Sequence, residues 1–182
     1  PMLRFALNEA HFRAALNASL APPFRLMVVD PGGGAWSSHE AESMGWRAMR
    51  RLMARAAVVV GVHGSAFANV FFAQSADGVH LIELNQLNGR ACHASMHQAA
   101  GASSTFWTIE PVAIDPRMLR RGRMLPAARS SFYTAPMWLP TQMVLLALQA
   151  AAVTDAARAE AALRACAHLL PPWPRWMPRH LV

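Results

Sequence analysis

Residues 57–69 read AVVVGVHGSAFAN, and this stretch decides the fold class of the 182-residue chain. Its first six residues are small or apolar and four of them are valine, which is typical of a central parallel strand buried on both faces. A turn at His63-Gly64 follows, and the pattern predicts a short helix over residues 65–73. A buried strand, a tight turn and a helix in this order indicate a βαβ unit.

Helix and strand patterns alternate on both sides of this stretch. The expected helices cover residues 8–20, 38–56, 65–73 and 90–100, and the expected strands cover residues 24–29, 57–62, 78–84 and 105–109. Strands separated by helices predict an α/β fold with a Rossmann-like parallel sheet and flanking helices. In that sheet, residues 58–60 are expected to lie beside Leu81 and Ile82, in adjacent parallel strands.

The last third of the sequence has a different pattern. Residues 111–140 are rich in proline, contain an arginine cluster and are expected to be irregular. Residues 141–170 predict one long alanine-rich helix or two shorter ones. We therefore expect a Rossmann-like part over residues 1–115. A Pro/Arg-rich, helical C-terminal extension over residues 116–182 is expected to pack on it.

The composition excludes several classes of protein. The chain is 54% apolar, enough for a core, and its 15% charged content is below the ~25% that is typical, which argues against extended disorder. Two cysteines, Cys92 and Cys166, are too few for a disulfide scaffold or a four-cysteine zinc site. The best apolar run, residues 143–153, is shorter than the ~18 residues of a spanning helix. Because the chain opens at Pro1 without a signal-like segment, we expect a fragment of a longer protein.

The turn after residues 57–62 has the features of an anion site. A helix that starts there presents unpaired backbone N–H groups and the positive end of its dipole. Gly64 lets a ligand approach the backbone closely, and His63 lies at the carboxyl end of the strand, where ligands of open α/β sheets bind. A tight structural turn explains the same residues equally well, and both interpretations stay open.

Glu83 is a second candidate, near the end of the strand over residues 78–84. An acidic residue that follows a phosphate-binding helix can accept hydrogen bonds from ribose hydroxyls. Taken alone, Glu83 is better explained as an edge or strand-end carboxylate that faces water.

In combination, these segments resemble the C-terminal half of glycosyltransferase family 61. In that family, a G-x-H-G-A-G-L-T/A-N-x-x-F block precedes a V-I-E strand, and here residues 61–72 read GVHGSAFANVFF and residues 79–84 read VHLIEL. Residues 4–9, RFALNE, resemble the family's R-x-I-x-N-E block, and residues 112–115, VAID, resemble its late strand. Two features depart from the family. Residues 65–67 read SAF in place of A-G-L, and a Glu-Gln pair before an amphipathic helix is not matched.

The resemblance implies that residues 1–115 form the nucleotide-sugar-binding half of a GT-B fold. It also implies which reaction the protein catalyses. The reaction is the inverting transfer of a sugar from a UDP-sugar to an acceptor hydroxyl, with this chain supplying the donor-binding half. His63 and nearby N–H groups would hold the diphosphate, Asn69 would brace the turn and Glu83 would hold the ribose. The implied donor-nucleotide site consists of Gly61, His63, Gly64, Ser65, Asn69 and Glu83. No metal and no cofactor besides the nucleotide sugar is expected, and no general base is assigned within the chain.

The expected partners follow from the same resemblance. They are a nucleotide sugar and a glycan or glycoprotein acceptor, and nucleic acid is not expected. Membrane association is expected only through a segment absent from this chain. A eukaryotic protein of this kind is expected in the secretory pathway, in the Golgi or the endoplasmic reticulum.

Other interpretations stay open. The lost glycine and the unmatched other half favour a non-catalytic, degenerate or truncated binding module, and an unrelated basic anion-binding α/β domain is a further alternative. A serine hydrolase is disfavoured, because Phe67 stands where G-x-S-x-G needs glycine. His93 and His97 have the spacing of zinc ligands, but no clear further ligand follows. The arginines between Arg117 and Arg123 are better explained as a solvated loop than as a nucleic-acid or lipid site.

Overall fold

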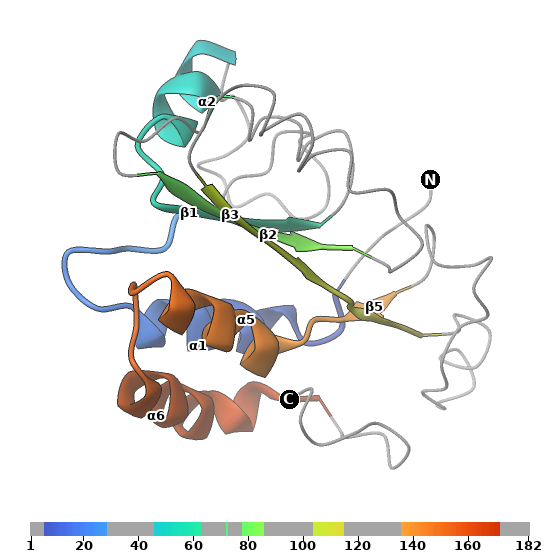
Figure 1. Cartoon of the computed structure of the whole chain (residues 1–182). Helices are drawn as coiled ribbons and strands as arrows, with labels where there is room; N and C mark the ends of the chain where they lie inside the picture. Colours follow the sequence, from blue (N-terminus) through green and yellow to red (C-terminus); the bar gives the residue numbers. More distant parts are fainter. Residues whose placement is uncertain are drawn as a thin grey trace. The chain divides into compact units, whose positions relative to one another are not determined.

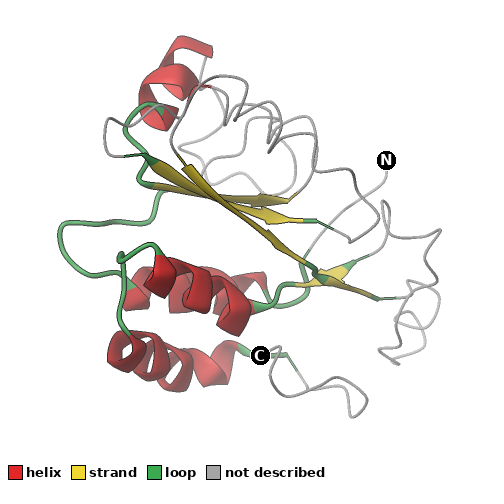
Figure 2. Ribbon diagram, viewed as in Figure 1, coloured by secondary structure: helices red, strands yellow, loops and turns green. Residues whose placement is uncertain are grey.

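The computed structural model describes residues 6–28, 46–62, 72, 78–85, 104–114 and 136–171 (Figures 1 and 2). The chain divides into two compact units, which we call the sheet unit (residues 27–109) and the helical unit (residues 1–26 and 110–182). The described elements of the sheet unit are α2 (Trp46–Met53), β1 (Val58–Val62), β2 (Val79–Leu84) and β3 (Ser104–Ile109). Those of the helical unit are α1 (Glu9–Ser19), β4 (Val112–Ala113), β5 (Met137–Trp138), α5 (Thr141–Ala150), α6 (Ala156–Cys166) and the 3-10 turn η3 (Ala167–Leu169).

β1, β2 and β3 form a parallel sheet in this order. Val59 pairs with Leu81 on one side, and Leu81 pairs with Phe106 on the other. The α/β fold class is confirmed, and so is the expected pairing of residues 58–60 with β2. The position of β1 differs from the prediction. Among the three described strands β2 is the middle one and is almost wholly buried, whereas β1 is half-buried, because neighbours on both sides shield β2 alone.

α2 covers one face of the sheet through its methionines. Met53 packs against the buried pair Val79 and Leu81. Met49, about one helical turn earlier, is 4% exposed. The exposed side chains of the helix are mostly cationic: Arg47, Arg50 and Arg51. α2 is therefore amphipathic, with its apolar face toward the sheet, and this fixes which face of the sheet is a core face.

In the helical unit, α1 packs against both α5 and α6 (Figure 1). α1 buries Phe12, Ala15 and Leu16, which recur at helical spacing as the sequence predicts. The apolar residues buried by the other two helices are Val144, Leu145, Ala147, Leu148, Ala159, Ala162 and Cys166. Because the buried face of α6 is mostly alanine, the backbones of α1 and α6 can approach closely.

Asn8 fastens the start of α1 to the segment that follows β5. Its side-chain Nδ2 donates to the Leu139 carbonyl oxygen at 2.8 Å, and the Leu139 N–H donates to its Oδ1 at 2.8 Å. The backbone of the preceding residue joins the same two segments, because the Leu7 N–H donates to the Met137 carbonyl oxygen at 2.8 Å. Asn8 is 1% exposed. The asparagine of the RFALNE block is thus a structural residue, which joins segments 131 positions apart.

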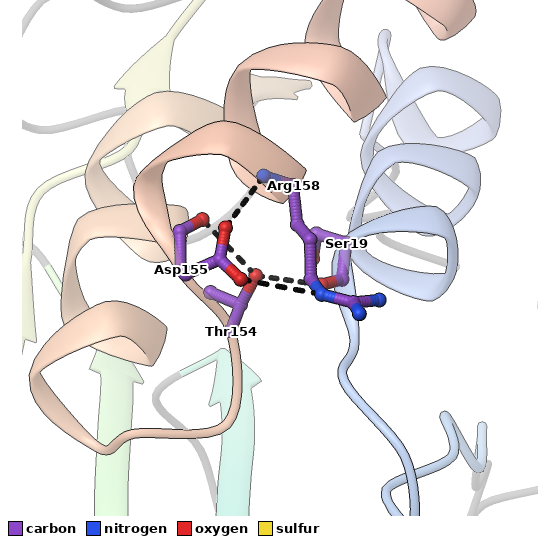
Figure 3. Close-up of polar contacts among 4 residues, drawn as sticks. All are labelled: Ser19, Thr154, Asp155 and Arg158. Carbon is purple, nitrogen blue, oxygen red and sulfur yellow. Dashed lines mark hydrogen bonds and ion pairs between the residues drawn. The ribbon is translucent and has the colours of Figure 1, made fainter.

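The helix expected over residues 141–170 is two helices, which was one of the two predicted alternatives. α5 ends at Ala150, and Ala152 adopts a left-handed φ of 55°, which turns the chain. Asp155 then caps α6, because its Oδ1 accepts from the Arg158 N–H at 2.8 Å (Figure 3). The Thr154 hydroxyl donates to the Ser19 carbonyl oxygen at 2.6 Å and so ties this turn to the end of α1 (Figure 3).

The prediction of a strand over residues 24–29 is wrong for the residues that the structure describes. Residues 24–28 form no strand, and Phe24 and Met27 are 39% and 48% exposed. A strand needs a neighbour for its backbone hydrogen bonds, and these residues pair with none of the described strands. Conversely, part of the segment expected to be irregular forms the antiparallel pair β4 and β5, and β4 lies in the VAID stretch that the resemblance matched to a late strand.

Several predictions fall outside the described residues. They are the helix over 90–100, the first part of the helix over 38–56 and, apart from Phe72, the helix over 65–73. The functional division at residue 115 stays a prediction. In the structure, α1 belongs to the same compact unit as the C-terminal helices. Within the described ranges, no helix combines the length and apolar character needed to cross a membrane.

Candidate functional site

The carboxyl ends of the three parallel strands meet at one edge of the sheet. At this edge Gly61 of β1 pairs with Glu83 of β2, and Glu83 pairs with Thr108 of β3. Neighbouring strands lie about 4.8 Å apart, so the sheet brings Gly61 and Glu83 directly beside each other. Two of the predicted site residues, distant in sequence, are therefore adjacent in the fold.

The register also decides which face of the sheet Glu83 occupies. Side chains alternate between faces along a strand, and paired residues of neighbouring strands lie on the same face. Leu81 lies on the face packed by Met53 of α2, and Glu83 is two residues further along the same strand. Glu83 therefore projects from the sheet face that α2 covers, near the carboxyl end of β2. Gly61 has no side chain, so β1 contributes no side chain beside the carboxylate on that face.

Glu83 is completely buried, with 0% of its surface exposed, and it has an interaction partner within the chain. The explanation favoured for Glu83 alone, an edge or strand-end carboxylate that faces water, is therefore wrong. The physical reason is that β2 has a neighbouring strand on each side, so Glu83 does not lie on an edge strand of the described sheet. Burying a carboxylate costs free energy unless neighbouring groups compensate for the lost hydration. The Glu83 side chain is therefore held by contacts within the protein and is not solvated.

Asn85 lies just beyond Glu83, and sequence reasoning missed it. Its backbone N–H donates to the Ile109 carbonyl oxygen at 3.0 Å, which extends the parallel pairing of β2 and β3 by one step. The residue is 5% exposed. Its Nδ2 is enclosed and has no hydrogen-bond partner among the described residues. The signal in the sequence was a second polar residue two positions after Glu83, at the end of an apolar strand.

A second polar pair lies at the opposite end of the strands, near their amino ends. His80 Nδ1 is hydrogen-bonded to the Thr105 hydroxyl, and these two residues are paired in register near the starts of β2 and β3. Because ligands of open α/β sheets bind at the carboxyl ends of the strands, we do not include this pair in the candidate site.

The other predicted site residues, His63, Gly64, Ser65 and Asn69, lie outside the described residues. His63 directly follows Val62, the last residue of β1. Cys92, His93, His97 and the arginines from Arg117 to Arg123 also lie outside the described residues. In the described part, no three His, Cys, Asp or Glu residues gather as a metal site.

A further buried polar group, His11, lies in the helical unit. It is 0% exposed, and its Nδ1 lies 3.3 Å from the Thr141 hydroxyl. Its Nε2 has no hydrogen-bond partner in the described ranges. Burial lowers the pKa of His11 below the ordinary value of 6.5, because removal from water disfavours the charged imidazolium. His11 is therefore a neutral core residue near neutral pH.

Comparison with models of protein families gives a match over the first part of the chain. The family model described as Glycosyltransferase 61 matches residues 2–80. The match confirms the resemblance drawn from the RFALNE block and the GVHG turn, and it ends three residues before Glu83. No curated protein and no solved structure matches the chain significantly.

Proposed function

We propose that this chain, assigned to glycosyltransferase family 61 by the match over residues 2–80, binds the nucleotide of a sugar donor at the carboxyl edge of β1 and β2. The observation that carries the proposal is the pairing of Gly61 with Glu83 at that edge. The family match supports glycosyl transfer in general, with a nucleotide sugar and an acceptor as substrates. A UDP-sugar donor, an inverting mechanism and a role as the donor half of a GT-B fold are the finer parts of the proposal.

In the proposed reaction, an acceptor hydroxyl oxygen attacks the anomeric carbon of the donor sugar from the face opposite the leaving group. The new C–O bond forms as the bond to the diphosphate breaks, and its electron pair leaves on the diphosphate. The hydroxyl proton passes to a general base that we do not assign to this chain. The residues proposed to act on the leaving group are His63 and the backbone N–H groups after Gly64, which would stabilise its charge.

Asn69 is proposed to brace the turn, with Gly61 and Ser65 completing the site. Glu83 is proposed to accept a hydrogen bond from a ribose hydroxyl. Since Glu83 is enclosed, the ribose must replace groups that now surround the carboxylate. Gly61 pairs with Glu83 and has no side chain to obstruct the ribose on that face.

The test is calorimetric titration of UDP, pyrophosphate and inorganic phosphate into the wild type and Glu83→Gln. Glutamine keeps the buried volume, whereas alanine would open a cavity in the sheet. Loss of a charge-assisted hydrogen bond of about 1.5–3 kcal/mol weakens UDP binding by about 10- to 150-fold. Pyrophosphate, which has no ribose, should bind both proteins equally. Unchanged UDP binding by Glu83→Gln would reject the ribose contact, and equal loss for both ligands would make Glu83 a positioning residue of the phosphate turn.

A non-catalytic binding module is the second candidate, and one observation favours it. Residues 65–67 read SAF where the family has A-G-L, which removes a glycine from the turn proposed to contact phosphate. A binding module would bind UDP without turning over a UDP-sugar. The protein expressed from its complete gene should therefore be assayed for release of UDP from UDP-glucose, UDP-N-acetylglucosamine and UDP-xylose, with and without glycan acceptors. Release of UDP from any of them supports the transferase.

The remaining parts of the proposal are broader. The transferred sugar is a hexose or a pentose, and the acceptor is a glycan or glycoprotein. In a eukaryotic cell the protein would act in the Golgi or endoplasmic reticulum. Residues 1–115 would form the nucleotide-sugar-binding part, with the C-terminal region supporting it through the contacts of α1 with α5 and α6.

A further inference from the structure

Asn85 carries an enclosed polar group that the described part of the chain does not satisfy. The residue is only 5% exposed, and its Nδ2 is enclosed and lacks a hydrogen-bond partner there. Leaving a buried donor unpaired costs free energy, and native structures rarely do so without a reason. A donor of this kind at the carboxyl end of the middle strand lies where open α/β sheets bind their ligands.

Asn85 is also correctly placed relative to Glu83. The bond from the Asn85 N–H to the Ile109 carbonyl oxygen extends the pairing of β2 with β3, so the backbone is still extended at this point. Residues two apart in an extended strand lie on the same face, about 6.6 Å apart. Asn85 and Glu83 therefore form a pair on one face, with Asn85 further toward the edge of the sheet.

A carboxamide offers a donor and an acceptor side by side. The imide edge of a uracil ring offers the matching groups, because its N3–H lies next to a ring carbonyl oxygen. A ribose and its base are joined directly, so a residue next to the ribose-binding carboxylate along the strand is in reach of the base. The two ends of an amide are nearly equal in size, so rotation of the amide can present either one.

We propose that Asn85 recognises the pyrimidine base of the donor nucleotide, with its amide nitrogen donating to a ring carbonyl oxygen and its amide oxygen accepting from N3–H. This inference rests on the proposed function and adds to it the residue that reads the base. Glu83 binds the sugar of the nucleotide, and Asn85 binds the ring attached to that sugar.

The experiment removes one partner from each side of the contact. Wild type, Asn85→Ala and Asn85→Ser are titrated calorimetrically with UDP, with 3-methyluridine diphosphate, which lacks the N3–H, and with ribose 5-diphosphate, which lacks the base. Asn17→Ala is the matched control, because Asn17 is exposed on α1 in the helical unit. Thermal melting of each variant establishes that it is folded.

Wild type should bind UDP about 2- to 13-fold more tightly than 3-methyluridine diphosphate, the range expected for the one neutral hydrogen bond that the N3–H makes. Both Asn85 variants should bind these two ligands equally, since the group that distinguishes them is gone, and all proteins should bind ribose 5-diphosphate alike. Retained discrimination in the Asn85 variants would overturn the inference. So would an equal loss for all three ligands, which would make Asn85 a structural residue. If wild type binds neither UDP nor ribose 5-diphosphate, the proposed function itself fails.

Discussion

Asn8→Ala tests how the helical unit is held together. The wild-type side chain satisfies both backbone groups of Leu139, at 2.8 Å each, and it is 1% exposed. Alanine leaves the Leu139 N–H and carbonyl oxygen buried without these partners, at about 1–3 kcal/mol for each group. Allowing for partial relaxation, we expect a total loss of about 2–4 kcal/mol in the free energy of unfolding. At ~2–4 °C per kcal/mol for a chain of this length, Tm should fall by about 5–15 °C.

The assay is urea denaturation followed by tryptophan fluorescence, to which Trp138 contributes from a fully buried position in β5, next to Leu139. Asn17→Ala is the control, because Asn17 is exposed on the same helix and its loss should change stability by less than about 0.5 kcal/mol. Asn8→Asp should be destabilised as well, because its carboxylate keeps the contact with the Leu139 N–H but faces the carbonyl oxygen without a donor. An Asn8→Ala variant as stable as the control would refute the assignment of Asn8 as the link between α1 and β5.

Two further predictions concern the cores of the two units. Leu81→Ala should lower the free energy of unfolding in urea by about 2–5 kcal/mol, because Leu81 is 0% exposed in the middle strand. Leu146→Ala, at a 50% exposed position of α5, should lower it far less. Similar losses for the two variants would contradict the described sheet core. His11 has a lowered pKa in the folded state, so the unfolded chain binds more protons below about pH 6.5, and the free energy of unfolding should decrease as the pH falls through that region. His11→Gln should remove this contribution, so that the difference in stability between wild type and variant narrows from pH 7.5 to pH 5; a constant difference would show that His11 does not titrate on unfolding.

The strands that could be predicted are those whose apolar runs need no further information. VVVGV and VHLIEL are recognisable as strands, and their parallel pairing follows from the helical pattern between them. Which strand is the middle one did not follow, because β1 is richer in β-branched residues but β2 is flanked on both sides. Residues 24–29 look equally apolar, yet an apolar run becomes a strand only beside a partner, and composition does not reveal partners.

The candidate site was predictable in part for a similar reason. Gly61 and Glu83 were identified by motif, and the register then placed them side by side. The burial of Glu83 and the unsatisfied amide of Asn85 depend on neighbours from other strands, which a linear pattern does not contain. The role of Asn8 depends on Leu139, 131 positions away, so the motif indicated that the residue matters but not why.

The central claim is that a nucleoside diphosphate binds at the carboxyl edge of β1 and β2. The most direct measurement is a titration of UDP into isotope-labelled protein, followed by the backbone amide signals in nuclear magnetic resonance spectra. We predict that the signals of Val62, Leu84 and Asn85 shift, while those of Val79 at the other edge of the sheet and of Ala159 in α6 stay unchanged. Absence of any shift at millimolar UDP, or shifts confined to the helical unit, would contradict the account.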